Sequence, residues 1–263
     1  MIRCRVSLAC SALLLLSPCA PAQAPPLRTV HVFVALADNQ HQGIVPVAPI
    51  LGNGDDAQHN LYWGSAYGVK TFFDRSADWQ VVLCYSRPKA EIIQRCVFKY
   101  RAAKIYLVAD AYRGMEIKQA ILDFLDSAAG GSADTLTIPK PEGDLKLPIG
   151  GGANLVAYIG HDGLMDFQLT KLPQQKNALH RDAILLACAS KQFFTDAVRA
   201  TGAYPLIWTT GLMAPEAYTL KSALDGWIAG ESNDQIRNRA AGAYDKYQKC
   251  GFRAAHRLLT TGW

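Results

Sequence analysis

Two reactive side chains, His161 and Cys188, stand at the ends of two short apolar runs in the sequence. Residues 155–159 lead into Gly160 and His161, and residues 183–187 lead directly into Cys188. Apolar runs of this length are typical of strands that are buried on both faces of a parallel sheet. Neighbouring parallel strands end at the same edge of a sheet, where open α/β folds hold their sites, so we expect His161 and Cys188 to meet there.

A cysteine beside a histidine predicts nucleophilic catalysis by a thiolate. The imidazole removes the thiol proton and stabilises the thiolate, which is the attacking form. Acyl transfer also requires N–H groups that stabilise the developing oxyanion. Gly163 lies in the turn beside the histidine, and the small residues Ala189 and Ser190 follow the cysteine. We therefore expect Cys188 to be the nucleophile and His161 the general base, with an oxyanion hole formed by the N–H groups of Gly163 and Cys188.

Each of these residues also has an ordinary structural interpretation. A cysteine that ends an apolar strand is usually a small buried side chain, and a histidine beside a turn usually caps it. His180 is a rival base, but its place in a connecting segment before Arg181 and Asp182 favours a solvated side chain. The ordered pair with its matching flanks favours the catalytic interpretation of His161 and Cys188.

A long polar loop, residues 38–56, follows the first apolar run and leaves the sheet at the same expected edge. Loops of this length inside a compact domain are often functional. Asp38 or Asn39 could orient His161. His41 could contact a substrate. Turn formation by Asp and Asn is the favoured interpretation of this loop.

The remaining pattern alternates strands with helices. Asn60 is a candidate N-cap for the first helix, and Ser232 or Asn233 for the last. Strands separated by helical patterns predict an α/β fold, a three-layer sandwich with helices on both faces of a mostly parallel central sheet of about six strands. Besides the two runs above, the expected strands are 29–37, 79–85 and 204–209 with a hairpin over 91–109 (or a helix over 91–100), the expected helices are 60–74, 114–128, 191–201, 216–229 and 233–249, and 132–152 is expected to be a loop.

Residues 1–24 are predicted to be a secretory signal peptide. Two arginines precede an apolar stretch over 6–16 that is too short to span a bilayer, and small residues follow, with cleavage expected after Ala22. The mature protein is then expected in the periplasm or outside the cell. Lipid anchoring at Cys19 is the weaker alternative, because Pro18 directly before the cysteine fits a lipoprotein signal poorly.

Residues 25–263 suit a single domain with a sizeable core. Half of the residues are hydrophobic and 19% are charged, as in ordinary globular proteins. The net charge of +5 is too small and too scattered for a nucleic-acid-binding surface. No later apolar run is long enough to predict a transmembrane segment. Residues 52–56 and His59 match no known ligand spacing, so no metal site is expected.

Four cysteines lie outside the predicted signal peptide, namely Cys84, Cys96, Cys188 and Cys250. An oxidising compartment would allow them to pair, and four cysteines have three connectivities between which the sequence cannot choose. A disulfide between Cys84 and Cys96 would join the second strand to the segment after it. A disulfide at Cys188 would remove the predicted nucleophile.

The arrangement resembles the caspase-like cysteine peptidases, the superfamily that includes caspases, legumain, gingipain, separase and the bacterial CHAT domains. Its signature is an apolar strand that ends in His-Gly, followed by an apolar strand that ends in Ala-Cys. Residues 155–163 and 184–190 match this signature in order and character. A strand ending in Trp208, the loop 213–216 and the last helix fit a CHAT-like pattern, so the resemblance extends over nearly the whole chain after residue 24.

The resemblance implies a caspase-like α/β domain and an exported cysteine peptidase that acts on peptide or protein substrates. It implies catalysis by Cys188 and His161 without a cofactor, although calcium supports some relatives. Relatives that cut after Arg or Lys often carry an acidic residue two positions before the cysteine. Leu186 stands there, so specificity for basic residues is not supported.

Asp162 departs from the family pattern, because it follows His161 where the pattern has glycine. It is a candidate for a supporting role beside the base. It also favours the alternative function, a non-catalytic binding module or pseudo-peptidase on the same scaffold, which would use the rim loops 38–56 and 132–152. A serine hydrolase of the α/β-hydrolase type is not favoured, because no Gly-x-Ser-x-Gly motif is present.

Overall fold

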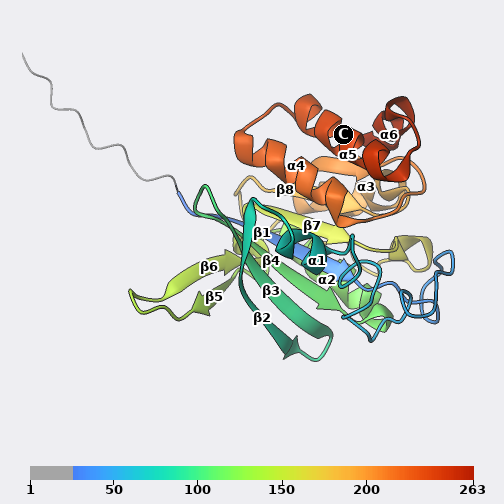
Figure 1. The fold of residues 1–263 in the computed structure, drawn as a ribbon. Helices are drawn as coiled ribbons and strands as arrows, with labels where there is room; N and C mark the ends of the chain where they lie inside the picture. The colour runs from blue at the N-terminus through green and yellow to red at the C-terminus, as the bar shows by residue number, and fades with distance from the viewer. Residues whose placement is uncertain (1–25) are drawn as a thin grey trace, which may run out of the picture.

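A large mixed sheet crosses the molecule, and helices cover both of its faces (Figure 1). The computed structural model describes residues 26–263, so the predicted signal peptide at 1–24 lies outside the described residues. Within the described part the sheet has eight strands. In order across the sheet they are β10 (Leu259–Thr260), β9 (Tyr204–Thr209), β8 (Asp182–Leu186), β7 (Leu155–Ile159), β1 (Arg28–Ala35), β4 (Ile105–Tyr112), β3 (Ile92–Tyr100) and β2 (Trp79–Lys89).

The centre of the sheet is parallel and its two margins are antiparallel. Strands β9, β8, β7, β1 and β4 run parallel to one another, whereas β3, β2 and β10 pair antiparallel with their neighbours. The fold is α/β as expected, but the expectation of about six mostly parallel strands is corrected to a larger, partly antiparallel sheet. The hairpin over 91–109 is confirmed as β3 and β4. β2 pairs with β3 through a two-residue connection, which only antiparallel strands allow.

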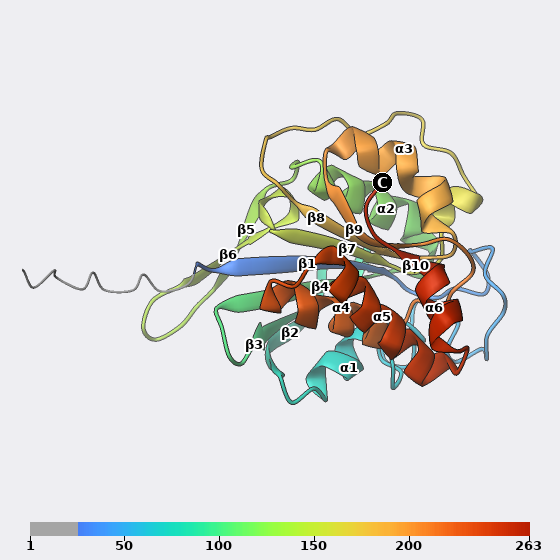
Figure 2. The same cartoon turned by 90° about the horizontal axis from the view of Figure 1, so that it is seen from above.

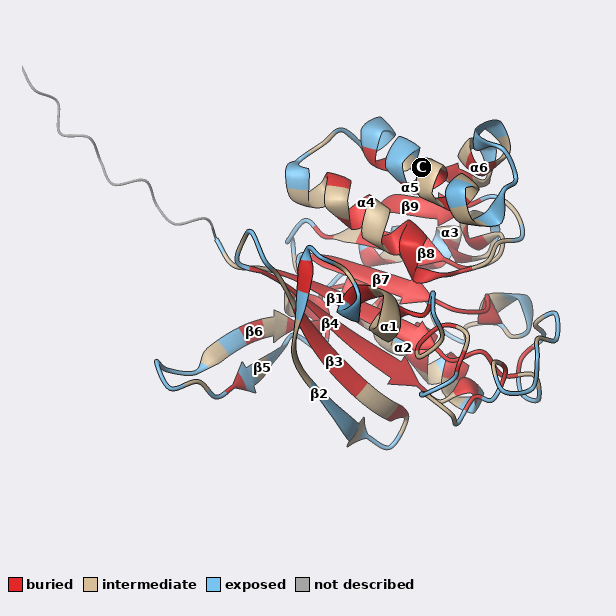
Figure 3. Cartoon of the chain, in the orientation of Figure 1, coloured by how far each residue is buried: buried red, intermediate tan, exposed pale blue. Residues whose placement is uncertain are grey.

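Helices cover the two faces of the sheet in separate layers (Figure 2), and alternate residues of β1 belong to the cores on opposite faces. The helices of the described residues are α1 (Val69–Asp74), α2 (Ile117–Ala128), α3 (Ser190–Thr201), α4 (Ala217–Ala229), α5 (Asn233–Gln248) and α6 (Phe252–Leu258). Val32 and Val34 belong to the core shared with α1, α4 and α5, and Phe33 and Ala35 to the core shared with α2 and α3. The central strands are therefore buried on both faces (Figure 3), which explains their unbroken apolar runs.

Two helices show how the sequence sets their bounds. In α2, Ile117, Ile121 and Phe124 recur at helical spacing and bury one face of the helix. α5 begins at a capping box, in which the Ser232 hydroxyl accepts the Gln235 N–H and the Gln235 side chain accepts the Ser232 N–H, so Ser232 is the N-cap. Among the described helices, none is long and apolar enough to cross a membrane.

The helix expected over 60–74 is corrected, because α1 begins only at Val69. Asn60 does not cap it. Instead the Asn60 side chain accepts a hydrogen bond from the Ala37 N–H at 3.0 Å and donates one to the Ala37 carbonyl at 2.8 Å. These long-range hydrogen bonds fasten the segment to the chain that leaves β1, and they outweigh the local helical spacing.

The segment 132–152, expected to be a loop, contains a small hairpin formed by β5 (Asp134–Ile138) and β6 (Leu145–Ile149). The hairpin projects from the body of the molecule (Figure 1). Its strands are short and lie among Gly, Pro and Asp residues, which favour turns, so the sequence pattern predicted a loop. α6 was also not expected. It follows Gly251, which adopts a φ of 86° and reverses the chain after α5.

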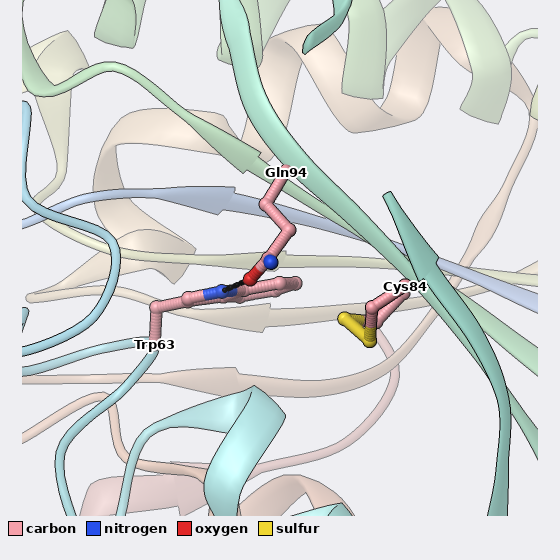
Figure 4. Close-up of a disulfide and its surroundings, with 4 residues drawn as sticks. Trp63, Cys84 and Gln94 are labelled. Carbon is pink, nitrogen blue, oxygen red and sulfur yellow. Dashed lines mark hydrogen bonds between the residues drawn. A yellow bond between two sulfur atoms is a disulfide. The ribbon is translucent and has the colours of Figure 1, made fainter. Parts of the chain in front are cut away.

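Cys84 and Cys96 form a disulfide between directly paired residues of β2 and β3 (Figure 4). Beside it, the Trp63 Nε1–H donates a hydrogen bond to Gln94 Oε1 at 2.8 Å and ties the segment before α1 to β3. Cys188 is a free thiol. The disulfide therefore leaves the predicted nucleophile available.

Candidate active site

β7 and β8 deliver His161 and Cys188 to the same edge of the sheet. The register of the two parallel strands pairs Ile159 with Leu186, the last residue of each strand. Beyond this edge, the Gly160 N–H donates a hydrogen bond to the Leu186 carbonyl at 3.3 Å. His161 and Cys188 both line one cavity of about 300 Å³.

The His161 ring is buried and held by Asp166. Its Nε2 lies 2.7 Å from the Asp166 Oδ2, which also accepts the Gly43 N–H at 3.1 Å. An ionised carboxylate only accepts hydrogen bonds, so Nε2 carries the proton in this pair and Nδ1 is the nitrogen left to take one. The Tyr158 hydroxyl donates to the His161 carbonyl at 2.7 Å and fixes the backbone. His161 thus has the tautomer and support of a general base.

Asp166 is the functional candidate that the sequence reasoning missed. It follows the 3-10 turn η3 (Gly163–Met165), which folds the chain back so that a residue five positions after His161 reaches its ring. An acidic residue at that separation was the only signal in the sequence. The contact between Asp166 and His161 depends on the turn η3, and periodicity in the sequence does not predict this turn.

Cys188 stands in a sharp turn between β8 and α3. Ala189 adopts a left-handed conformation with a φ of 46°, and α3 begins at the next residue. The half-buried Cys188 Sγ accepts the Met213 N–H at 3.4 Å, and its thiol donates to the Met213 carbonyl at 3.6 Å. Among the described residues no hydrogen bond joins this Sγ to His161. Catalytic hydrogen bonds are often long before substrate binds, so a catalytic pair does not require this bond in the free protein.

Burial raises the pKa of the Cys188 thiol. The hydrogen bond from the Met213 N–H lowers this pKa, and the negative charge of Asp162 raises it further. These effects together hold the resting cysteine in its neutral form.

The backbone N–H of Cys188 is free to donate. The next two N–H groups of the turn are occupied, since Ala189 donates to the Gly211 carbonyl at 2.8 Å and Ser190 to the Thr209 hydroxyl at 3.1 Å. Within the described residues the Cys188 N–H has no such acceptor. It therefore remains a candidate oxyanion donor beside the nucleophile.

Gly163, the other expected oxyanion donor, packs against α2 and is not among the residues that line the cavity. A Cβ at this position would lie 2.8 Å from Phe167 and 2.9 Å from Ile121, so a larger residue would displace these side chains. The packing of η3 on α2 therefore accounts for this glycine.

Asp162 is fully buried beside the pair. Its Oδ1 accepts the Leu164 N–H at 3.0 Å, and its Oδ2 has no hydrogen-bond partner within the described residues. Burial and the neighbouring charge of Asp166 raise the pKa of Asp162 to about 7. The φ of Asp162 is −77°, an ordinary value, so the absence of glycine here imposes no backbone strain.

Asp38 and Asn39 lie in turns rather than on the base. The Asp38 Oδ1 accepts the N–H groups of Gln40 and His41, and the Asn39 amide is bonded to the backbone of Val47. Neither side chain has a hydrogen bond to His161 in the described part of the chain. The turn interpretation therefore accounts for both, and the contact expected of them is made by Asp166.

His180, the rival base, is exposed and pairs with Asp182 at 3.2 Å, outside the cavity. Across the described residues no group of three or more His, Cys, Asp or Glu side chains is arranged to hold a metal ion. The arrangement of His161, Asp166 and Cys188 is suited to acyl transfer by a thiol. No protein-family model, curated protein or solved structure matches the chain.

Proposed function

We propose that the protein is an exported, caspase-like cysteine peptidase that hydrolyses peptide bonds with Cys188 as nucleophile and His161 as general base. The observation that carries the proposal is the common cavity at the ends of two adjacent parallel strands, lined by both side chains. The Asp166 carboxylate on His161 Nε2 supports it further, because it leaves Nδ1 to act as the base. This adds a third partner to the two residues expected from the sequence.

The reaction proceeds by two acyl transfers. His161 Nδ1 takes the thiol proton of Cys188 as Sγ attacks the carbonyl carbon of the scissile peptide, and the oxyanion accepts a hydrogen bond from the Cys188 N–H. The C–N bond then breaks, and His161 gives its proton to the leaving amine. Water, deprotonated by His161, attacks the thioester and releases the carboxylic acid and the thiol.

Export is part of the proposal. The disulfide between Cys84 and Cys96 supports it, because disulfides persist chiefly in oxidising compartments. The signal pattern over residues 1–24 points to the same destination, and the mature enzyme is expected to begin close to Gln23.

A pseudo-peptidase or binding module is the second candidate function. The raised pKa of Cys188, the hydrogen bond that its thiol donates to the Met213 carbonyl and the buried Asp162 favour this candidate, because each disfavours a thiolate. Such a protein would bind peptides in the same cavity without cleaving them.

Peptide hydrolysis by the purified mature protein separates the two candidates. A diverse peptide mixture is incubated with the protein and new termini are identified by mass spectrometry. We expect cleavage that falls by at least about 1,000-fold in Cys188→Ala and His161→Ala. Cys250→Ser, which removes the exposed free thiol, is the matched control and should cleave normally. Cleavage that survives Cys188→Ala, or binding of peptides without cleavage by the wild type, would refute the peptidase.

A further inference from the structure

The cavity that holds His161 and Cys188 has an aliphatic wall. Its side chains come from four segments of the chain, the loop after β1, the segment before α1, the turn η3 and the loop after β9. The large aliphatic side chains that line it are Ile44, Val45, Val47, Leu61, Met165, Leu212 and Met213. A volume of about 300 Å³ lies at the lower end of the range for ligand pockets, so it accommodates a single side chain with its adjoining peptide groups.

The wall carries no Asp, Glu, Lys or Arg side chain. Two carboxylates near the site already have partners. Asp166 is bonded to His161, and the buried Glu216 accepts the Tyr218 hydroxyl at 2.9 Å. The third, Asp162, is fully buried and does not line the cavity. A charged substrate side chain in this cavity would therefore lose its hydration without gaining a counter-ion.

The rim of the cavity exposes large apolar side chains. Val45 is 81% exposed and Leu212 is 73% exposed, and each belongs to a different loop. Exposed apolar side chains that gather at a cavity mark a binding surface more often than a chance arrangement. The nucleophile in the same cavity requires that the occupant presents an electrophilic carbonyl carbon.

We propose that this cavity selects peptides with an uncharged aliphatic or aromatic side chain, such as that of Leu, Met or Phe, on the residue whose carbonyl is attacked by Cys188. The inference rests on the proposed peptidase function and assigns its substrate class. Arg, Lys, Asp and Glu at that position are rejected, because the wall offers them no opposite charge. Burial against Val45 and Leu212 contributes most of the selection.

A panel of fluorogenic peptides that differ only at this position tests the proposal. We expect kcat/KM to be at least about 100-fold higher with Leu, Met or Phe than with Arg or Asp. A preference for Arg or Asp, or equal rates across the panel, would overturn the substrate class while leaving the peptidase intact. If no member of the panel or of a diverse peptide mixture is cleaved, the peptidase function itself fails, and the substrate class with it.

A charge placed on the rim gives an independent test. Leu212→Glu introduces a carboxylate at an exposed position, so folding should be preserved. We expect the ratio of kcat/KM for Arg over Leu to rise by at least about tenfold. Leu179→Glu is the control, because Leu179 is 63% exposed in the segment before β8 and does not line the cavity. If Leu212→Glu and Leu179→Glu have the same ratio of kcat/KM for Arg over Leu, the pocket that selects the substrate side chain lies elsewhere.

Discussion

The Asp166 carboxylate determines which nitrogen of His161 can take a proton. It holds Nε2 from one side of the ring, and it is itself positioned by η3 and by the Gly43 N–H. This contact gives the imidazole an orientation and a tautomer before any substrate arrives. Asp166 is a positioning residue, since it acts on substrate only through His161.

Asp166→Asn should therefore lower kcat by about 100-fold with little change in KM. The asparagine can donate to Nε2 and stabilise the wrong tautomer, whereas the fold should be kept because Asp166 is 41% exposed. Steady-state kinetics and a thermal melt check both expectations. Asp56→Asn is the control, because Asp56 and His59 form another pair, with a 2.7 Å contact, outside the cavity. An unchanged kcat in Asp166→Asn would contradict the role.

Asp162 makes the stability of the protein depend on pH in an unusual direction. Its pKa rises from 3.8 to about 7 on folding, so between these values the folded protein keeps a proton that the unfolded chain has lost. The slope of unfolding free energy against pH follows the protons bound by the unfolded state minus those bound by the native state. The contribution of Asp162 to stability therefore falls as pH rises from about 4 to about 7.

Asp162→Asn should remove this pH dependence. Relative to the wild type, the variant should gain about 2 kcal/mol of unfolding free energy between pH 5 and pH 8, measured by urea denaturation. Asp126→Asn is the opposite control, because Lys176 and Ser132 hold the pKa of Asp126 below its usual value. Stability should be lost in that variant at pH 8. A difference in unfolding free energy between the wild type and Asp162→Asn that does not change with pH would contradict the buried, partly unpaired state of the Asp162 carboxyl.

The turn after β8 is the element that presents the nucleophile. Ala189 in a left-handed conformation lets α3 begin at once, and the two N–H groups after Cys188 are bonded away from the cavity. Cys188, the proposed nucleophile, therefore lies between the buried strand β8 and a helix that buries one face. The free N–H of Cys188 is a consequence of this turn.

The disulfide between β2 and β3 supports a different part of the fold. It links residues 12 apart in sequence at the antiparallel margin of the sheet. The double variant Cys84→Ser, Cys96→Ser should lose about 2–3 kcal/mol of unfolding free energy, because the unfolded chain regains the entropy of that loop. Its kcat/KM should stay within about twofold of the wild type, since β2 and β3 contribute no residue to the cavity. A loss of activity without a loss of stability would contradict this separation.

Elements with unbroken local signals were predictable from the sequence, and those set by distant contacts were not. β7 and β9 were predicted with the bounds they have, because each is a continuous apolar run, and α2 and α5 were predicted closely, because their buried residues recur at helical spacing. The helix predicted over residues 60–74 does not form over 60–68, because the Asn60 side chain makes hydrogen bonds to the backbone of Ala37. β10 has two residues and pairs with β9, from which α4, α5 and α6 separate it in the chain.

The candidate site also combines features that local patterns predicted with features that depend on long-range packing. The parallel pairing of β7 and β8 brings His161 and Cys188 to one cavity, and the apolar runs before the two residues predicted this pairing. Asp166 was not predicted, because its contact depends on η3. The wall of the cavity was not predicted either, because it combines four separate segments of the chain. Local sequence patterns therefore locate His161 and Cys188. Long-range packing provides Asp166, which orients His161, and the cavity wall, which we propose selects the substrate.

Covalent labelling of the mature protein by a leucyl acyloxymethylketone peptide tests whether His161 and Cys188 form a catalytic pair. The probe leaves a thioether on a cysteine that an adjacent base activates, and intact-mass spectrometry counts the adducts. We expect one adduct on Cys188, its loss in His161→Ala, and an unmodified Cys250. No adduct on Cys188, or equal labelling in wild type and His161→Ala, would contradict a catalytic pair of His161 and Cys188.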